Sequence, residues 1–234
     1  MQTGLLTLIR VSAFIATVTL WRWALQRSFS PGGNLLCLVG SVLAVFPVVW
    51  IGRRLLDRRP TPERVAWVTT GVHGVLMVLF GVAIVKAIQT ADAWRALVLP
   101  VPRPLGLILV VVTGLLTLLT VLNLAVRGLG APFAIALSRR LATDWLYGRT
   151  RNPMVLATLA WLVAVGLLLQ SAAFVLWAVG LVAAAWIAFL KVYEERELEI
   201  RFGSAYLAYK EKTPFLWPRA PLRRGESVRG HVGR

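Results

Sequence analysis

The loop at residues 147–154 places groups suited to binding an anion beside the predicted start of a helix. Arg149 and Arg151 precede Pro153, and proline suits the first helical turn because it lacks an N–H group that the helix would leave unpaired. The other N–H groups of a first turn are free, and the positive end of the helix dipole lies there. The sequence therefore predicts a site for a carboxylate or phosphate group at this turn.

A second segment with candidate chemistry is acidic. Four of the ten acidic residues of the chain lie within residues 194–199. Two interpretations are open. The glutamates could form the solvated start of an amphipathic helix, where acids interact favourably with the helix dipole, or Glu194 and Glu195 could bind a cation.

The apolar stretch 153–192 connects the two segments. One span needs about 20 residues, so this stretch is nearly long enough for two, and its most polar interior point is Gln170-Ser171. We predict a helical hairpin with arms at 153–169 and 172–192. Since a hairpin returns to the side where it began, the glutamates and the arginine turn should face each other across a small pocket. A zwitterionic amino-acid group would suit that pocket, with its carboxylate at the helix end and its ammonium at the glutamates.

From Leu198 onward the pattern indicates an amphipathic surface helix. Leu198, Phe202, Tyr206 and Tyr209 recur at helical spacing and form one apolar face. Such a helix would lie on the membrane and cover the pocket.

The rest of the chain predicts an all-α integral membrane protein with about six transmembrane helices, the last two forming the hairpin, followed by the amphipathic cytoplasmic helix. Its residues are 58% hydrophobic and only 15% charged, whereas soluble domains average about 25% charged residues. The four other apolar stretches lie at about 4–20, 34–51, 65–88 and 104–126. We expect an N-terminal membrane region of four helices over 1–126, a functional region over 127–218 and a disordered basic tail over 219–234.

Arginine-rich loops alternate with arginine-poor ones. The loops near 52–64 and 127–152 and the tail are rich in arginine, and those near 21–33 and 89–103 are poor in it. With six spans all the rich loops fall on one side, so both termini are predicted to be cytoplasmic and the protein to lie in the inner (plasma) membrane.

The charge pattern also bears on the expected partners. The net charge of +16 resides in loops and the tail, which favours interaction with membrane lipids over nucleic acid. One cysteine and two histidines make a metal site improbable on composition. Arg10, inside the first span, is interpreted either as a snorkelling side chain or as a contact to a lipid headgroup, and His73 as an interhelical hydrogen bonder.

The two segments resemble the motifs of the isoprenylcysteine carboxyl methyltransferase and phospholipid methyltransferase superfamily of membrane enzymes. The second motif is complete, and its matching residues are Glu194, Glu195, Leu198, Phe202, Gly203, Tyr206 and Tyr209, followed by Pro214 and Pro218. The first motif is partial, and its matching residues are Tyr147, Arg151, Pro153 and Met154, with Asn152 in place of the usual histidine. Gly128, Gly130 and Pro132 are similar to the glycine-rich approach to this motif. The resemblance covers about residues 127–218.

The resemblance implies an S-adenosylmethionine-dependent methyltransferase whose cofactor binds at the cytoplasmic membrane boundary. Tyr147, Arg151, Asn152, Pro153 and Met154 would then line the turn beside the cofactor, with Glu194 and Glu195 at its amino end. This chain departs from the family at Trp145-Leu146, where the family has Gly-Pro, and at Val155, where it has tyrosine.

The function expected is methyl transfer to a lipophilic small-molecule acceptor in the membrane, such as a phospholipid amine or an isoprenoid acid. The acceptor would enter sideways from the bilayer, and the acceleration would come mostly from aligning donor and acceptor. No residue stands out as a general base. The alternative is a non-enzymatic membrane protein, such as a transporter, an assembly factor or a lipid-binding relative, that keeps the fold.

Overall fold

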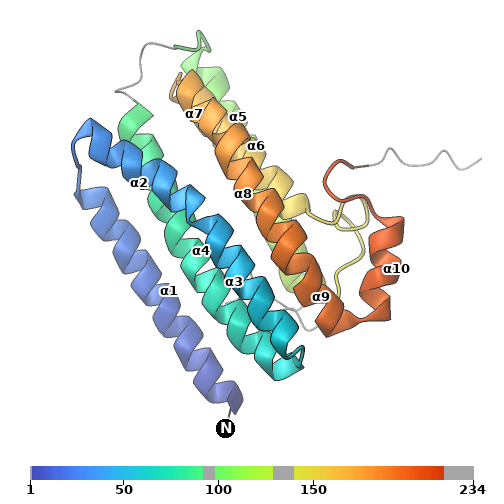
Figure 1. Ribbon diagram of the computed structural model, residues 1–234. Coiled ribbons are helices and arrows are strands. Elements are labelled where there is room, and N and C mark those ends of the chain that lie inside the picture. The colour runs from blue at the N-terminus through green and yellow to red at the C-terminus, as the bar shows by residue number, and fades with distance from the viewer. Residues whose placement is uncertain (1, 92–97, 129–139, 219–234) are drawn as a thin grey trace, which may run out of the picture.

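Long helices make up nearly all of the computed structural model, which describes residues 2–91, 98–128 and 140–218 (Figure 1). Five of them are long and apolar enough to cross a membrane, and a sixth, shorter apolar helix lies at Pro153–Leu168. The predicted all-α membrane architecture is confirmed. The predicted tail at 219–234 and the motif residues Gly130 and Pro132 lie outside the described residues.

The N-terminal part of the chain forms three antiparallel spans. Helix α1 covers Gln2–Gln26 and α4 covers Pro62–Ala91; between them α2 (Pro31–Leu43) and α3 (Val45–Arg58) together form one kinked span. Pro47 lies just after the junction of α2 and α3, and a proline without a backbone donor kinks a helix near its preceding turn.

Helix α1 is attached mainly to α4. The indole Nε1 of Trp21 donates to the carbonyl of Met77 at 3.1 Å, and a side chain at Gly81 would collide with that indole. The buried ammonium of Lys86 donates to the carbonyls of Ala24 and Arg27, which lie at the end of α1. Since the last carbonyls of a helix have no partner within it, Lys86 acts as a C-terminal cap supplied by the neighbouring helix.

The two polar residues noted within the spans both have hydrogen-bond partners in the protein. Arg10 donates to the hydroxyl of Thr70 on α4 at 3.0 Å. His73 Nδ1 lies 3.0 Å from the carbonyl of Thr69 in its own helix, while its ring packs edge-on against Phe189 at 5.3 Å. The prediction of an interhelical hydrogen bond for His73 is therefore wrong, because the backbone one turn earlier supplies the partner and the contact between helices is aromatic.

Helices α5 (Arg103–Gly128) and α6 (Pro153–Leu168) pack antiparallel along their lengths. Two glycines allow the close approach. Gly106 faces the backbone of Leu168, and Gly114 faces the ring of Trp161. The end of α5 therefore lies level with the start of α6.

The predicted helical hairpin is confirmed. Gln170 takes a positive φ of 53° and turns the chain, and the Ser171 hydroxyl caps the next helix by accepting from the backbone N–H of Phe174 at 3.2 Å. The Gln170 carbonyl and side-chain amide also bond to Leu99 and Val101, which joins the two loops at this end of the bundle.

The returning arm of the hairpin is longer than predicted. It runs without a break through α7 (Ala172–Leu176), a π-helical segment Trp177–Val182, α8 (Ala183–Ala188), a second π-helical segment Phe189–Glu194, and α9 (Glu195–Phe202). Single π-turns inside helices are frequent at functional sites. Here the second π-helical segment ends at the candidate pair Glu194 and Glu195.

The single surface helix predicted from Leu198 onward is wrong. The chain breaks at Gly203, whose φ is +53°, and a separate helix α10 covers Ser204–Lys212. Glycine adopts this backbone conformation without the Cβ clash that other residues meet. Leu198 and Phe202 therefore belong to the returning arm of the hairpin. The apolar periodicity runs on to Tyr206 and Tyr209 although the chain turns at Gly203 between the two helices.

The main hydrophobic core lies between α2, α3, α4 and both arms of the hairpin, with Val49, Phe80, Leu162, Val182 and Tyr193 among its residues. The start of α1, the α3–α4 turn, the loop before α6 and helix α10 all lie at one end of the bundle, which we call the motif end (Figure 1). The opposite end contains the hairpin turn.

Candidate functional site

The two candidate segments meet at the motif end of the bundle, as predicted. The Arg151 guanidinium Nη1 lies 3.0 Å from Glu195 Oε1, and both side chains are nearly buried, with exposed fractions of 8% and 11%. The same nitrogen donates to the Tyr206 hydroxyl at 3.4 Å. The predicted anion-binding arginine and cation-binding glutamate thus contact each other directly and join the loop before α6 to α9.

Two lysines complete the environment of Glu195. Lys210 Nζ lies 2.6 Å from Oε2, and Lys191 Nζ lies 3.2 Å from Oε1. The hydrogen bond from Lys210 to Glu195 raises the pKa of that lysine, so it stays protonated at neutral pH. With three cations around one carboxylate, Glu195 is neutralised by the protein itself and positions the loop and α10.

The turn Thr150-Arg151-Asn152 is held by the segment that follows α10. The backbone N–H of Arg151 donates to the Pro214 carbonyl at 2.9 Å, and the Asn152 side-chain amide donates to the Phe215 carbonyl at 2.8 Å. The Thr150 hydroxyl donates to the Leu216 carbonyl at 2.8 Å. The motif turn is thereby fixed by residues more than 60 positions later in the chain.

The start of α6 keeps its N-terminal donors available. Pro153 is buried at the first helical position, and Asn152 stands at the N-cap without a side-chain hydrogen bond to the helix, because its amide is engaged with Phe215. Met154 follows in the first turn. Helix N-termini without a cap attract anions through their free N–H groups and the helix dipole. This turn can bind a carboxylate.

Glu194 differs from Glu195 in lacking partners. Among the described residues it makes no hydrogen bond or ion pair, whereas its neighbour has three. After burial, the nearby charge of Glu194 is the next cause of the raised pKa of Tyr147, so the two side chains lie close together. Of the two glutamates, Glu194 is the one free to bind an ammonium group.

Three tyrosines surround this region. Burial raises the pKa of Tyr147, Tyr206 and Tyr209 well above the usual value, so all three phenols stay neutral. The Tyr209 hydroxyl donates to the Tyr147 carbonyl at 2.7 Å and ties α10 to the loop. Neutral aromatic rings stabilise a nearby cation through their negative faces, and phenols with a raised pKa do not serve as general bases at neutral pH.

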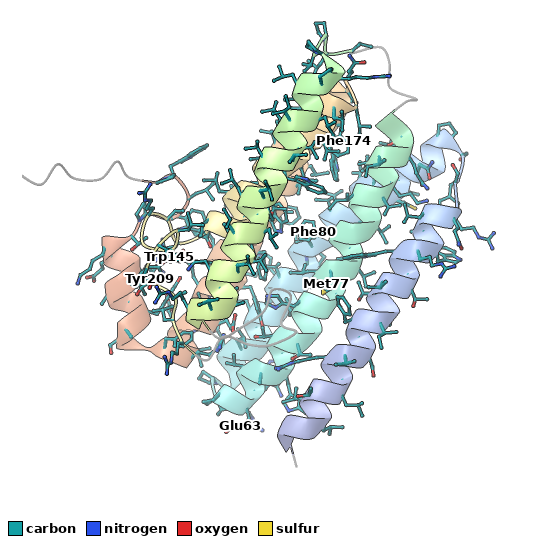
Figure 2. All side chains as sticks on the ribbon, turned by 180° about the vertical axis from the view of Figure 1, so that it is seen from behind. Glu63, Met77, Phe80, Trp145, Phe174 and Tyr209 are labelled. Carbon is teal, nitrogen blue, oxygen red and sulfur yellow. The ribbon has the colours of Figure 1, made fainter. Side chains whose placement is uncertain are left out.

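The departures from the family pattern have different structural settings. Trp145, at the glycine position of the motif, has a positive φ of 53°, a conformation that favours glycine. Its side chain is 70% exposed and lies 5.3 Å from the Arg127 guanidinium, near Tyr209 at the motif end (Figure 2). Val155 is buried in the core within the first turn of α6.

Helix α3 supports the glutamate helix from the other side. Gly52 lies against the ring of the fully buried Tyr193, and Arg53 Nη1 donates to the Val192 carbonyl at 3.0 Å. Asp57 is 2.9 Å from Arg196 Nε. The N-terminal helices thus hold the residues on both sides of Glu194 and Glu195 in place.

Sequence reasoning missed Lys191, Lys210 and Phe215 at this site. Lys191 lies four residues before Glu195, a spacing at which helical side chains meet, so it could have been found. Lys210 and Phe215 lie at the site only because the chain turns at Gly203, and the apolar periodicity around Gly203 does not predict that turn. The Phe215 ring is 3.9 Å from Lys191 Nζ.

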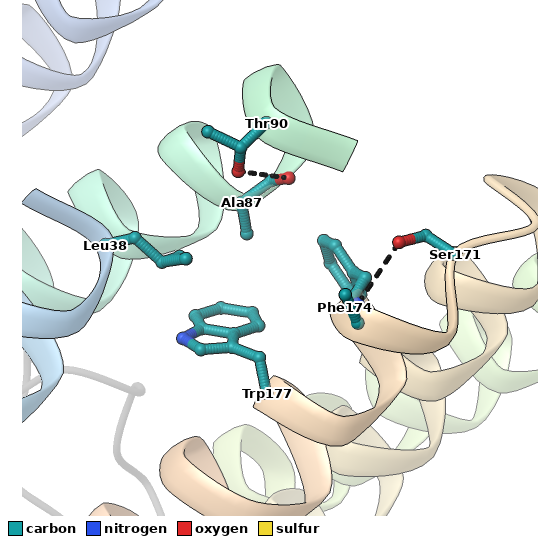
Figure 3. Close-up of a pocket in the computed structure, with 7 residues that line it drawn as sticks. Leu38, Ala87, Thr90, Ser171, Phe174 and Trp177 are labelled. Atoms are coloured by element: carbon teal, nitrogen blue, oxygen red, sulfur yellow. Dashed lines mark hydrogen bonds between the residues drawn. The ribbon is translucent and has the colours of Figure 1, made fainter. Parts of the chain in front are cut away.

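A small pocket of about 10 Å³, drawn in Figure 3, lies beside the hairpin turn at the opposite end of the bundle. Leu38, Ala87, Phe174 and Trp177 are among its lining residues, and none of the lining side chains is ionisable. It contains none of the motif residues. No group of three histidine, cysteine, aspartate or glutamate side chains suited to a metal ion occurs in the described part of the chain.

Comparison with known proteins adds one finding. Residues 102–205 match the family described as phospholipid methyltransferase, which confirms the resemblance. The match includes α5, which lies mostly outside the resemblance, and it leaves out α1–α4. No curated protein and no solved structure matches the chain.

Proposed function

Because residues 102–205 match the phospholipid methyltransferase family, we propose that this protein transfers a methyl group from S-adenosylmethionine to a lipophilic acceptor in the membrane. The reaction takes place at the motif end of the bundle. The observation that carries the proposal is the unequal pair of glutamates, one neutralised by three cations and one without a partner, beside an uncapped helix start.

The residues at the motif end fit the amino-acid part of this cofactor. The first turn of α6, at Pro153 and Met154, is suited to its carboxylate, and Glu194 is suited to its ammonium group. Arg151 keeps one buried nitrogen, Nε, without a partner, which adds a donor near that turn. The faces of Tyr147 and Tyr206 are suited to its positive sulfur.

When bound, the cofactor would supply a methyl group carried on a positively charged sulfur, which is already an excellent leaving group. The protein's part is to hold the two molecules in line, an effect worth up to about 7–11 kcal/mol of barrier in well-oriented reactions. Glu195, Arg151 and Lys210 fix the turn and α10. Since the three phenols are neutral, none of them takes a proton from the acceptor at neutral pH.

A lipophilic acceptor is supported by the surroundings of the site. Helix α5 exposes a row of large apolar side chains that would face lipid, including Leu107, Leu115, Leu119 and Val126. The motif end of α5 lies beside the start of α6, so a molecule moving in the bilayer could approach the site between helices. The acceptor classes we propose are phospholipid amines, isoprenoid acids and similar lipids. We place the motif end, and with it both termini, on the cytoplasmic side of the inner (plasma) membrane.

The test is transfer of labelled methyl groups into lipid. Purified protein in vesicles of a bacterial lipid extract is incubated with methyl-labelled S-adenosylmethionine, and the organic phase is counted. We expect label in lipid, reduced roughly ten- to hundredfold by Glu194→Gln because a charge-assisted hydrogen bond is lost. Glu211→Gln, an exposed acid on α10, is the matched control. Label that stays in the aqueous phase with every lipid class tried, or equal transfer by both variants, would overturn the proposal.

A further inference from the structure

Asn123 of α5 is a buried amide without any hydrogen bond. Its side chain is 3% exposed, and neither Oδ1 nor Nδ2 has a partner. A buried polar group that makes no hydrogen bond costs about 1–3 kcal/mol. Asn123 therefore lowers the stability of the free protein, and a ligand that pairs with the amide would remove this penalty.

The position of Asn123 follows from its neighbours along α5. It lies one turn before Arg127, on the same face of the helix. Arg127 Nε lies 3.3 Å from Asp144, and its guanidinium lies 5.3 Å from the Trp145 ring. The Gly128 carbonyl accepts from the backbone N–H of Arg140. Residues 140, 144 and 145 of the loop before α6 thus contact the end of α5, about one turn beyond Asn123.

The packing of α5 on α6 gives the same location independently. Gly106 faces Leu168, and Gly114, two turns further along α5, faces Trp161 on α6. Continuing this antiparallel register places Asn123 level with the first turn of α6. The unpartnered amide and the uncapped helix start therefore lie at the same depth, at the end of α5 and the beginning of α6.

We propose that Asn123 recognises the adenine ring of the cofactor through a pair of hydrogen bonds from its side-chain amide. This inference rests on the proposed function. An amide presents one acceptor and one donor side by side, which matches the N6 amino group and the neighbouring ring nitrogen of adenine.

The other parts of the cofactor suit other groups. Its carboxylate and ammonium are matched by the start of α6 and by Glu194, and the ribose hydroxyls suit the solvated side of the loop. Adenine is flat and largely apolar, so it is the part best suited to the buried surroundings of Asn123, whose side chain is 3% exposed. The phospholipid methyltransferase match, which includes α5, is consistent with a residue of this helix taking part in binding.

The test is calorimetric binding of S-adenosylhomocysteine and its 7-deaza and N6,N6-dimethyl analogues to the full-length protein in detergent. Asn123→Leu keeps the volume and removes the amide, and its free form should be at least as stable as wild type, because an unpaired polar group is gone. We expect it to bind S-adenosylhomocysteine roughly ten- to hundredfold more weakly than wild type. Thr120→Val, one turn away with its hydroxyl bonded to its own helix, should bind with unchanged affinity.

The analogues separate base recognition from packing. Wild type should lose affinity for at least one analogue, whereas Asn123→Leu should bind that analogue and the parent compound equally. Unchanged binding of the parent by Asn123→Leu would overturn the inference and leave the proposed function standing. Equal weakening of the parent and both analogues in the variant would also overturn it, since the residue would then act by packing. Absence of binding by wild type would instead contradict the proposed function.

Discussion

Replacing Glu195 with glutamine removes the negative charge that three cations share. The carboxylate lies 3.0 Å from Arg151, 3.2 Å from Lys191 and 2.6 Å from Lys210. The two lysine side chains are 45% and 33% exposed, so water can solvate them once the charge is gone. Arg151, at 8% exposed, cannot turn to water and would remain a buried cation with the Tyr206 hydroxyl as its polar partner.

The cost of Glu195→Gln therefore comes mainly from Arg151. Removing one partner of a buried ion pair costs about 3–5 kcal/mol. The amide oxygen of glutamine can still accept one hydrogen bond from the guanidinium, so we expect a loss near the lower end of that range, about 3 kcal/mol. The variant should remain folded and should bind the cofactor more weakly, because the turn before α6 loses its anchor.

Unfolding in detergent, followed by tryptophan fluorescence, measures this loss. The matched control is Glu199→Gln, since Glu199 also pairs with Lys210, at 3.2 Å, but is 26% exposed. Exposed pairs contribute at most about 1 kcal/mol. Adding Arg151→Met to the Glu195→Gln variant should recover part of the lost stability, because the buried cation is removed as well. Equal losses in the two glutamate variants, or no recovery in the double variant, would refute the reasoning.

Three further predictions concern the N-terminal helices and the topology. Lys86→Met should lower the free energy of unfolding by about 2 kcal/mol, because it leaves carbonyls at the end of α1 unpaired. Lys212→Met, on the exposed end of α10, should change it by less than about 0.5 kcal/mol. Thermal unfolding of the two variants measures the difference. Gly81→Ala should destabilise by about 1–3 kcal/mol through collision with Trp21, whereas Gly74→Ala, which meets open space, should be neutral or stabilising in the same measurement. A reporter fused to the C-terminus should be active in the cytoplasm, and activity outside it would contradict the predicted orientation.

The spans and the meeting of the two motif segments could be predicted because each depends on a local pattern. Apolar stretches of membrane length gave the helices, and Gln170 marked the hairpin turn. A hairpin necessarily returns its second arm to the starting side, so the proximity of Arg151 and Glu195 followed without any knowledge of side-chain packing.

What the sequence could not predict depends on contacts between distant residues. The corner at Gly203 interrupts a periodicity that continues on both sides of it, and this corner brings Lys210 and the Phe215 segment onto the site. The motif contains both Glu194 and Glu195, so it does not predict that Glu195 is paired with three cations and that Glu194 has no partner. Asn123 lies in an ordinary apolar span, and only the packing of α5 on α6 and the contact between Arg127 and Asp144 connect it with the motif end.

The central claim is tested most directly by titrating S-adenosylhomocysteine into the purified protein by calorimetry, with Glu194→Gln and Glu211→Gln measured in parallel. The account predicts saturable binding by wild type and by Glu211→Gln, and binding roughly ten- to hundredfold weaker by Glu194→Gln because the ammonium loses its carboxylate. Absence of binding by folded wild-type protein, or equal affinity in all three proteins, would contradict it.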